Sequence, residues 1–220
     1  MKRKNFLDKI NYIIWDWNGT IINDVQLCVD IINQLLKEYN LAQIGLKTYR
    51  NIFTFPVKKY YKKLGFDLNN INFEKIGNKF IELYNKRCNE IELQPGAKNL
   101  LTILQKRKKQ ILISARNYDS LVKDVQLFEL KSYFDKIIGL NNDLAYGKWH
   151  IVKKFFEIEK IDPKLTLFIG DTVHDLEIAK KIGAHYLMVS NGHNSAWRLM
   201  TLTPFVYSNL ISLPDFLLNA

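Results

Sequence analysis

The sequence contains few cysteines and no long hydrophobic run. Its two cysteines, Cys28 and Cys88, are too few among 220 residues for a disulfide framework. We expect two buried free thiols in a reducing cytosol, and therefore a cytoplasmic protein. No apolar stretch approaches the length of a membrane-spanning helix, and residues 1–12 do not have the pattern of a signal peptide. We therefore expect no membrane partner.

Glycine and proline are also scarce, with 10 and 5 residues, and the sequence has no repeat or low-complexity segment. Hydrophobic residues make up 47%, enough for the core of one domain, or of one domain with an insert. The formal net charge is +10, but the basic residues form short clusters without a basic and aromatic RNA motif or a zinc spacing. We interpret these clusters as solvated helix faces and expect no nucleic-acid partner.

An apolar run near the start of the chain ends abruptly at a carboxylate. Residues 12–15 read Tyr-Ile-Ile-Trp, Asp16 follows, and Gly19-Thr20 then turns the chain. Continuous hydrophobicity is typical of a strand that is buried on both faces, as in a parallel sheet. Open α/β sheets bind their ligands where the strands end, so Asp16 is a candidate active-site residue.

The next segment contains helical patterns and no convincing strand. We predict helices over 24–39, 56–64 and 73–88, the first with Asp24 as its N-cap. Because a βαβ unit needs only about 30 residues, the surplus favours an inserted helical subdomain. We predict a helical cap over 23–92, a return hinge at 93–96, and an α/β core domain over 1–22 and 93–220.

From residue 96 onward, strand and helix patterns alternate regularly. We predict strands over 110–114, 136–139, 165–169 and 184–189, and helices over 96–106, 119–128, 149–156 and 174–182. An edge strand over 204–207 and a C-terminal helix follow. This alternation predicts the α/β class, with a doubly wound parallel sheet as a Rossmann-like core.

Polar groups follow three of the predicted strands and should meet at one edge of the sheet. They are Asp16, the pair Ser114-Ala115, and Asp171, with Asp175 near the start of the next helix. Three carboxylates at close range repel one another by several kcal/mol, so a cation is required. Oxygen ligands suit Mg²⁺, especially where a phosphate completes its shell. Lys148, at the head of a helix, would add a positive charge for an anionic substrate.

These residues have the order and spacing of a known set of motifs. The stretch 16–20 (Asp-Trp-Asn-Gly-Thr), Ser114, Lys148 and the stretch 170–175 resemble the four motifs of the haloacid-dehalogenase-like superfamily. The chain is most similar to its phosphoglycolate-phosphatase-like branch, which carries a helical cap after the first motif. The resemblance covers nearly the whole chain and implies a Mg²⁺-dependent phosphohydrolase for a small phosphorylated metabolite.

The resemblance also implies roles for single residues. Asp16 would be the nucleophile that forms an aspartyl-phosphate. Mg²⁺ would be held by Asp16, the carbonyl of Asn18, Asp171 and Asp175, and phosphate by Ser114, the backbone N–H of Ala115, and Lys148. The cap would choose the substrate. There Arg50 is a candidate for binding a second anionic group, and Arg116 and Asn117 are candidates at the sheet edge. The loop 191–193 should border the site, with His193 as a loop residue rather than a base.

One position departs from the pattern of the superfamily. Where its phosphatases carry a second Asp, which protonates the leaving oxygen and later activates water, this chain has Asn18. An amide cannot shuttle a proton, and acid–base help is worth about 10²–10⁴ in rate. The loss should matter most for alkyl phosphate esters and least for acyl phosphates, aryl phosphates and phosphoanhydrides.

Four explanations for Asn18 stay open. The enzyme acts on good leaving groups, or His174 or Asp24 replaces the missing acid. Alternatively, the protein is a catalytically impaired one that binds phosphorylated ligands without turnover, or Asn18 is an engineered change. We favour a natural enzyme, active or weakly active, and we expect a monomer or homodimer.

Overall fold

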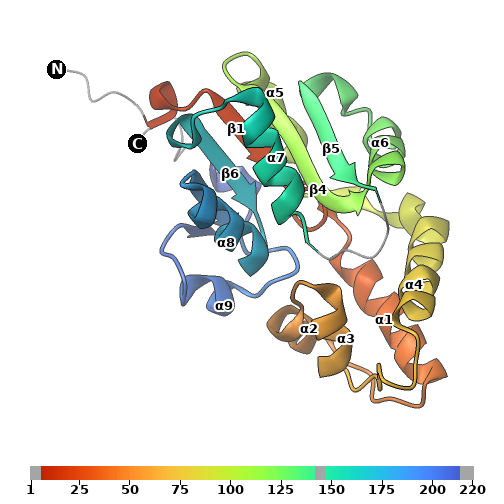
Figure 1. The fold of residues 1–220 in the computed structure, drawn as a ribbon. Coiled ribbons are helices and arrows are strands. Elements are labelled where there is room, and N and C mark those ends of the chain that lie inside the picture. Colours follow the sequence, from red (N-terminus) through yellow and green to blue (C-terminus); the bar gives the residue numbers. More distant parts are fainter. Residues whose placement is uncertain (1–5, 142–146, 214–220) are drawn as a thin grey trace.

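A six-stranded parallel sheet forms the centre of the computed structural model, which describes residues 6–141 and 147–213 (Figure 1). The strand order is β5-β4-β1-β6-β7-β8, and each neighbouring pair is parallel. The strands are β1 (Tyr12–Trp15), β4 (Lys109–Asn117), β5 (Lys136–Leu140), β6 (Thr166–Gly170), β7 (His185–Val189) and β8 (Val206–Tyr207). The predicted α/β class is confirmed.

Helices cover both faces of this sheet. Alternate strand residues such as Ile14 and Phe168 pack against α7 (Trp149–Glu159) and α8 (Val173–Ile182). Their neighbours along the strands, such as Ile13 and Leu167, belong to the large core that includes α5 (Ala97–Gln105) and α6 (Tyr118–Leu127). Because both faces are buried, the strands are continuous apolar runs in the sequence.

The central strand β1 lies at the point where the chain order reverses. The chain reaches β4 and β5 on one side of β1, and later returns to β6, β7 and β8 on the other side. Trp15 pairs with Leu112 of β4 and with Ile169 of β6, so the residues that follow these strands emerge close together. This reversal is where open α/β sheets place their ligands.

The cap is made of four helices that lie beyond the carboxyl ends of the strands (Figure 1). They are α1 (Val25–Glu38), α2 (Leu46–Ile52), α3 (Val57–Lys63) and α4 (Phe73–Arg87). Helix α2 was not predicted from the sequence. Two short antiparallel strands, β2 (Ile22–Asn23) and β3 (Glu92–Leu93), connect this part to the sheet. The exact domain boundaries, 23–92 against the remainder, stay a prediction.

Some local predictions differ from the structure. Asp24 does take the N-cap position of α1, but its side chain makes no capping hydrogen bond because it is turned toward other partners, described below. Cys28 is buried as expected, whereas Cys88 is partly exposed. A further helix, α9 (Ala196–Met200), was not predicted. The predicted C-terminal helix falls largely outside the described residues. Short 3₁₀ helices occupy Phe6–Lys9, Cys88–Glu90, Lys131–Tyr133, Pro163–Leu165 and Leu210–Ser212.

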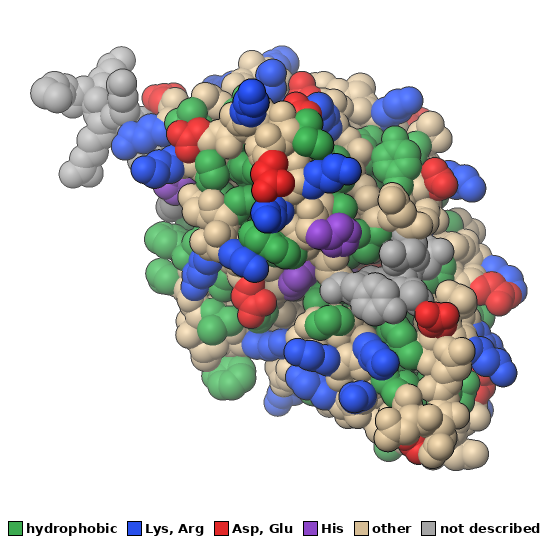
Figure 2. Space-filling model, viewed as in Figure 1, with side chains coloured by type: hydrophobic (Ala, Val, Ile, Leu, Met, Phe, Trp, Pro, Cys, Tyr) green, Lys and Arg blue, Asp and Glu red, His purple; other side chains and the backbone are tan. Residues whose placement is uncertain are grey.

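Lys and Arg side chains are spread over the face shown in Figure 2, with a group of them on the cap. On α3, Lys58, Lys59, Lys62 and Lys63 are all exposed. Such solvated helix faces agree with the interpretation of the basic clusters given above. Within the described ranges, no helix is both long and apolar enough to cross a membrane.

Candidate active site

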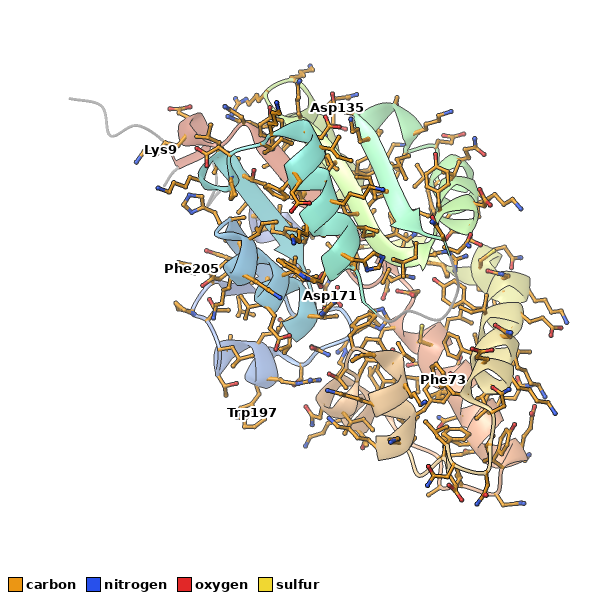
Figure 3. All side chains as sticks on the ribbon, in the orientation of Figure 1. Lys9, Phe73, Asp135, Asp171, Trp197 and Phe205 are labelled. Carbon is orange, nitrogen blue, oxygen red and sulfur yellow. The ribbon has the colours of Figure 1, made fainter. Side chains whose placement is uncertain are left out.

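Three buried carboxylates meet at the carboxyl edge of the sheet. Asp16 directly follows β1, Asp171 follows β6, and Asp175 lies in the first turn of α8. One oxygen from each lies within 4.8 Å of the others. Figure 3 shows the labelled Asp171 at this edge, where the core faces the cap. The structure therefore brings together the three acidic residues that the sequence predicted to meet.

Hydrogen bonds fix two of these carboxylates in place. Asp171 accepts the hydroxyl of Thr20 at 2.8 Å and the backbone N–H of His193 at 2.6 Å. Asp175 accepts the hydroxyl and the backbone N–H of Thr172 at 2.6 and 3.0 Å, which forms a capping box at the start of α8. Both side chains are thus oriented before any ligand arrives.

Two glycines allow the backbone to approach Asp171 closely. A Cβ atom at Gly19, which has φ of +77°, would lie 2.4 Å from Asp171 Oδ2, and one at Gly192 would lie 2.2 Å from it. No real Cβ atom is tolerated at such distances. The turn after β1 and the loop after β7 therefore need glycine at these positions.

Lys148 lies among the carboxylates and is only 1% exposed. Its Nζ makes ion pairs with Asp16 and, at 2.7 Å, with Asp175 Oδ1, and it donates to the carbonyl of Ile113 at 3.0 Å. Although burial opposes it, the attraction of Asp16 and Asp175 raises the pKa of Lys148. Lys148 is thus a fixed positive charge beside the predicted nucleophile.

The charges of this cluster do not balance. Burial, reinforced by Asp175 and Asp171 and opposed by Lys148, raises the pKa of Asp16 to about 8. Burial likewise raises the pKa of Asp171 to about 6, with His193 opposing this rise and Asp175 adding to it. Burial also acts on Asp175, but the Lys148 ammonium and Thr172 lower the pKa of Asp175. With all three ionised, one lysine leaves two negative charges unbalanced, the charge of one divalent cation.

The donor set also fits a hard divalent cation. All the ligand atoms that the three aspartates offer are oxygens, which Mg²⁺ and Ca²⁺ prefer. Asp16, Asp171 and Asp175 are therefore suited to hold such an ion.

Asn18 faces a second buried carboxylate, Asp24. The Asn18 amide donates to Asp24 Oδ2 at 2.8 Å and to the hydroxyl of Tyr84, from the cap helix α4, at 2.9 Å. Tyr84 in turn donates to Asp24 Oδ2 at 3.0 Å, and the backbone N–H of Gly19 donates to Oδ1 at 2.9 Å. Asp24 thus connects the turn after β1 to the cap.

The ring of His193 is buried between Asp24 and the cap. Its Nε2 lies 3.3 Å from Asp24 Oδ1, and its Nδ1 lies 2.8 Å from the hydroxyl of Tyr49. Burial opposes charge on both partners, but their mutual attraction and hydrogen bonding lower the pKa of Asp24 to about 2 and raise that of His193 to about 9. We expected His193 to be a loop residue; it lies in a loop and is also half of a buried ion pair.

A cavity of about 150 Å³ lies between the carboxylates and the cap. Asp16, Asn18, Asp175 and Lys148 line its core side, together with the predicted residues Ser114, Ala115, Arg116 and Asn117. The hydroxyl of Ser114 is 3.1 Å from the backbone N–H of Arg116, which donates to it. Asn117 uses its side-chain oxygen as the N-cap of α6.

Arg50 is not among the described residues that line this cavity. Its guanidinium donates to the backbone carbonyls of Asn191 and Gly192, at 2.7 and 2.9 Å, in the loop after β7. The structure therefore places Arg50 at a contact between cap and core, apart from the other predicted site residues, with its Nε and one Nη bonded to these carbonyls.

His174, one of the two candidates to replace the missing acid, lies at the cavity wall. Its Nε2 accepts the backbone N–H of Lys148 at 3.1 Å, and its ring stacks on Phe55. Burial lowers the pKa of His174 to about 4, despite the opposing charge of Asp175. A neutral ring whose accepting nitrogen is already bonded has no proton there to give.

Two residues of the site, Tyr49 and Tyr84, were not predicted. From the cap, Tyr49 binds His193 and Tyr84 binds Asp24. A tyrosine on an amphipathic helix has the same pattern as a core residue, so the sequence contained no signal that separated these two from their neighbours. Asp24 takes the predicted cap position of α1, but its side chain binds Tyr84 and His193, which come from distant segments of the chain.

Comparisons with known proteins agree with this geometry. The family model described as "Haloacid dehalogenase-like hydrolase" matches residues 13–189. "Putative pyrophosphatase PpaX" of Caldanaerobacter subterraneus is 24% identical over 183 residues, 82% of each chain. Phosphoglycolate phosphatase of Synechococcus elongatus is 21% identical and covers 94% of this chain and 95% of its own. A haloacid dehalogenase-like hydrolase from Streptococcus pneumoniae superposes with a TM-score of 0.77 at 18% identity, over 95% of this chain and 99% of its own.

The family model spans both the sheet and the cap, and it includes every residue of the carboxylate cluster. A match of this extent establishes the family, whereas the structural likeness, at such low identity, establishes the fold. The chain belongs to the haloacid dehalogenase-like hydrolase family.

Proposed function

We propose that this hydrolase is a Mg²⁺-dependent phosphatase that acts on a small phosphorylated metabolite through an aspartyl-phosphate on Asp16. One observation carries the proposal: three buried carboxylates lie within 4.8 Å of one another beside a cavity that Ser114 and Lys148 also line. The names of the relatives, a pyrophosphatase and a phosphoglycolate phosphatase, support phosphate compounds as the substrate class.

The ion would be held by Asp16, Asp171, the backbone carbonyl of Asn18, and Asp175. When bound, it offsets the repulsion between an anionic nucleophile and an anionic phosphate and neutralises charge in the transition state.

The protein residues would divide the remaining work. Asp16 attacks the phosphorus, and Lys148 orients its carboxylate through their ion pair. The hydroxyl of Ser114, the backbone N–H of Ala115 and the ammonium of Lys148 bind phosphate oxygens, as charge-assisted hydrogen bonds do elsewhere. Because Asp16 and Lys148 are buried, water competes little for either group.

Asn18 limits which substrates react well. Its amide is held by Asp24 and Tyr84, so it orients groups near the cap but supplies no proton. The same observation favours a second candidate function, a protein of this fold that binds a phosphorylated ligand without turning it over.

Fluoride capture separates the two functions. In the phosphatase, beryllium fluoride should bind Asp16 only when Mg²⁺ is present, and ¹⁹F NMR should detect it. Asp16→Asn should abolish this signal, whereas Glu157→Gln, at an exposed carboxylate, should leave it unchanged. Absence of capture, together with a phosphorylated ligand that survives intact for hours, would establish the binding protein instead.

A further inference from the structure

The cap side of the cavity is an apolar and aromatic wall. One face of α4 contributes Phe73, Gly77, Phe80, Ile81 and Tyr84, which recur at helical spacing. None of the described cap residues that line the cavity is a lysine or an arginine. The face of α4 that points into the site is thus suited to hydrocarbon rather than to charge.

Aromatic rings from α2, α3 and the segment between them continue this wall. Phe53 stacks on Tyr49 with centroids 5.3 Å apart, and meets Phe55 and Tyr60 edge to face at 5.5 and 5.3 Å. All four side chains line the cavity. A flat aromatic group is bound well by such rings, since offset-stacked and edge-to-face contacts add to the burial of its area.

The cationic side chains at the cavity are already paired. Arg116 Nε lies 2.5 Å from Asp124 Oδ2. The guanidinium also lies over the ring of Tyr84 and donates a hydrogen bond to the side-chain oxygen of Asn85. Lys148 is held by Asp16 and Asp175, and the protonated His193 ring by Asp24. A second anionic group on the substrate would therefore meet no unpaired lysine or arginine among the described lining residues, and burying an unpaired charge is unfavourable.

The leaving group is constrained by Asn18, which has no proton to give. A phenol has a pKa near that of tyrosine, about 10, whereas aliphatic alcohols are nearer to water, at roughly 16. A phenolate therefore leaves without protonation, and an alkoxide does not. The chemistry of position 18 and the lining of the cavity thus both favour an aryl group on the phosphate.

Building on the proposed phosphatase function, we propose that the substrate is an aryl phosphate without a second anionic group. An oxygen of Asp16 forms a bond to phosphorus as the bond from phosphorus to the phenolic oxygen breaks, and the phenolate leaves with the electron pair. Water then attacks phosphorus and Asp16 is released as a carboxylate. Of the two protons of that water, one stays on phosphate and the other reaches the phenolate through solvent.

The first test compares substrates on the unmodified protein with Mg²⁺. Phenyl phosphate should exceed phosphoglycolate and pyrophosphate at least tenfold in kcat/KM. It should also exceed cyclohexyl phosphate, which has a similar apolar shape and a poor leaving group, at least 100-fold. A preference for phosphoglycolate or pyrophosphate would overturn the inference while leaving the phosphatase function intact. Equal kcat/KM for phenyl phosphate and cyclohexyl phosphate would also overturn it.

The second test adds a cation to the wall. Ile81→Arg should lower kcat/KM for phenyl phosphate at least tenfold relative to phosphoglycolate, whereas Asn78→Arg, an exposed position of the same helix, should leave this ratio unchanged. Gly77→Leu, which places an uncharged side chain at the cavity, should also lower kcat/KM for phenyl phosphate at least tenfold relative to the smaller phosphoglycolate. This variant would replace Ile81→Arg if Ile81→Arg failed to fold. If Ile81→Arg and Gly77→Leu had the same ratio of kcat/KM for phenyl phosphate to that for phosphoglycolate as Asn78→Arg, the inference would be contradicted.

A binding measurement covers the case in which no substrate is hydrolysed, which would refute the proposed phosphatase function. By calorimetry with Mg²⁺, benzylphosphonate should then bind at least tenfold more tightly than phosphonoacetate if the cavity selects an aryl group. Equal or weaker binding of benzylphosphonate would refute the inference as well.

Discussion

The amide of Asn18 points at a carboxylate that the fold has already buried. Asp24 is fully buried and receives hydrogen bonds from Asn18, Tyr84 and Gly19. An aspartate at position 18 would place a second carboxylate oxygen where the amide now donates, 2.8 Å from Asp24 Oδ2. The two positions thus form a matched donor and acceptor, which favours a natural Asn18 over an engineered one.

We predict that Asn18→Asp destabilises the protein by roughly 1–3 kcal/mol, since it replaces a hydrogen bond by repulsion between buried groups. Asp24→Asn should also destabilise, because His193 loses its partner. The double variant, which exchanges acid and amide, should be more stable than the sum of the single effects predicts. Urea denaturation of all four proteins gives this coupling energy.

The same variants test the missing acid. If position 18 accounts for poor alkyl phosphate hydrolysis, the double variant should gain 10²-fold or more on cyclohexyl phosphate, within the range of acid–base catalysis. Its rate on phenyl phosphate should change much less. An unchanged rate on both substrates would refute the missing-acid explanation.

The ion pair of His193 and Asp24 predicts a pH dependence of stability. The folded pKa of His193, about 9, lies above its ordinary value of 6.5, so its contribution to stability is complete below pH 6.5 and is lost as pH rises through 9. The folded pKa of Asp24, about 2, lies below its ordinary value of 3.8. Its contribution to stability is therefore complete above pH 3.8 and is lost as pH falls through 2. Tyr49, Cys28, Asp171 and Asp16 are further titratable groups near the ring.

We therefore predict that His193→Gln costs most stability between about pH 4 and 6.5, up to about 3 kcal/mol, and less at pH 9. The measurement is the free energy of unfolding across this range. His150→Gln, at an exposed histidine, is the control and should change little at any pH. A cost for His193→Gln that is the same at pH 6 and pH 9 would show that the ring is neutral in the folded protein.

Two site residues that directly follow buried strands could be placed together from the sequence. Asp16 and Asp171 could be placed together because the ends of parallel strands share one edge. The partners of Asp24 could not, since Tyr84 and His193 approach it from segments 60 and more than 100 residues away. No local pattern encodes such a convergence.

At the scale of elements, the segment from the end of β7 through α9 holds the cap against the core. Arg50 of α2 donates to the carbonyls of Asn191 and Gly192, and Arg198 and Asn194 donate to the carbonyl of Phe53. Every one of these bonds crosses between cap and core. Opening the cap would have to break them.

We predict that Arg50→Ala weakens this contact by about 1–2 kcal/mol, near the low end for hydrogen bonds to a charged group because Arg50 is only partly buried. The cap should then open about 5- to 30-fold more often. Hydrogen exchange of residues 191–195 should accelerate accordingly. Lys47→Ala, an exposed position on the same helix, is the control. Equal exchange in both variants would show that Arg50 does not hold the cap closed.

Long, strongly patterned elements were predictable, and short ones were not. The helices α1 and α4 follow from apolar periodicity, and the central strands of the sheet follow from continuous apolar runs. Helix α2 has only seven residues, of which Leu46, Tyr49 and Ile52 are apolar, too short a pattern to separate from a loop. The two-residue strands β2 and β3 exist only because they pair with each other.

At the scale of the whole molecule, the excess of positive charge and the acidic site are separate features. The lysines of α3 are exposed on the cap, whereas the aspartates of the site are buried beneath it. A cytoplasmic location, a monomer or homodimer, and the absence of a nucleic-acid partner stay predictions. If a nucleic acid bound to this basic surface, its affinity would fall steeply as the salt concentration rises.

The unbalanced charge of the site predicts that Mg²⁺ stabilises the entire fold. An ion at 100 times its dissociation constant adds about 2.7 kcal/mol, which raises the Tm of a chain of this size by roughly 5–10 °C. Calorimetry at pH 8 should show this rise in the unmodified protein and in Glu157→Gln. Asp16→Asn should lose most of it.

Without Mg²⁺, the unmodified protein should no longer have a higher Tm than Asp16→Asn. Burial raises the pKa of Asp16 to about 8, so ionising its carboxyl group destabilises the folded state as pH rises from about 4 to 8. The amide of Asp16→Asn removes that buried charge, while Lys148 keeps Asp175 and Ile113 as partners. At pH 8 the metal-free variant should therefore melt no lower than the unmodified protein. A large loss of Tm in Asp16→Asn without metal, or no response of the unmodified protein to Mg²⁺, would contradict a site built around a divalent cation.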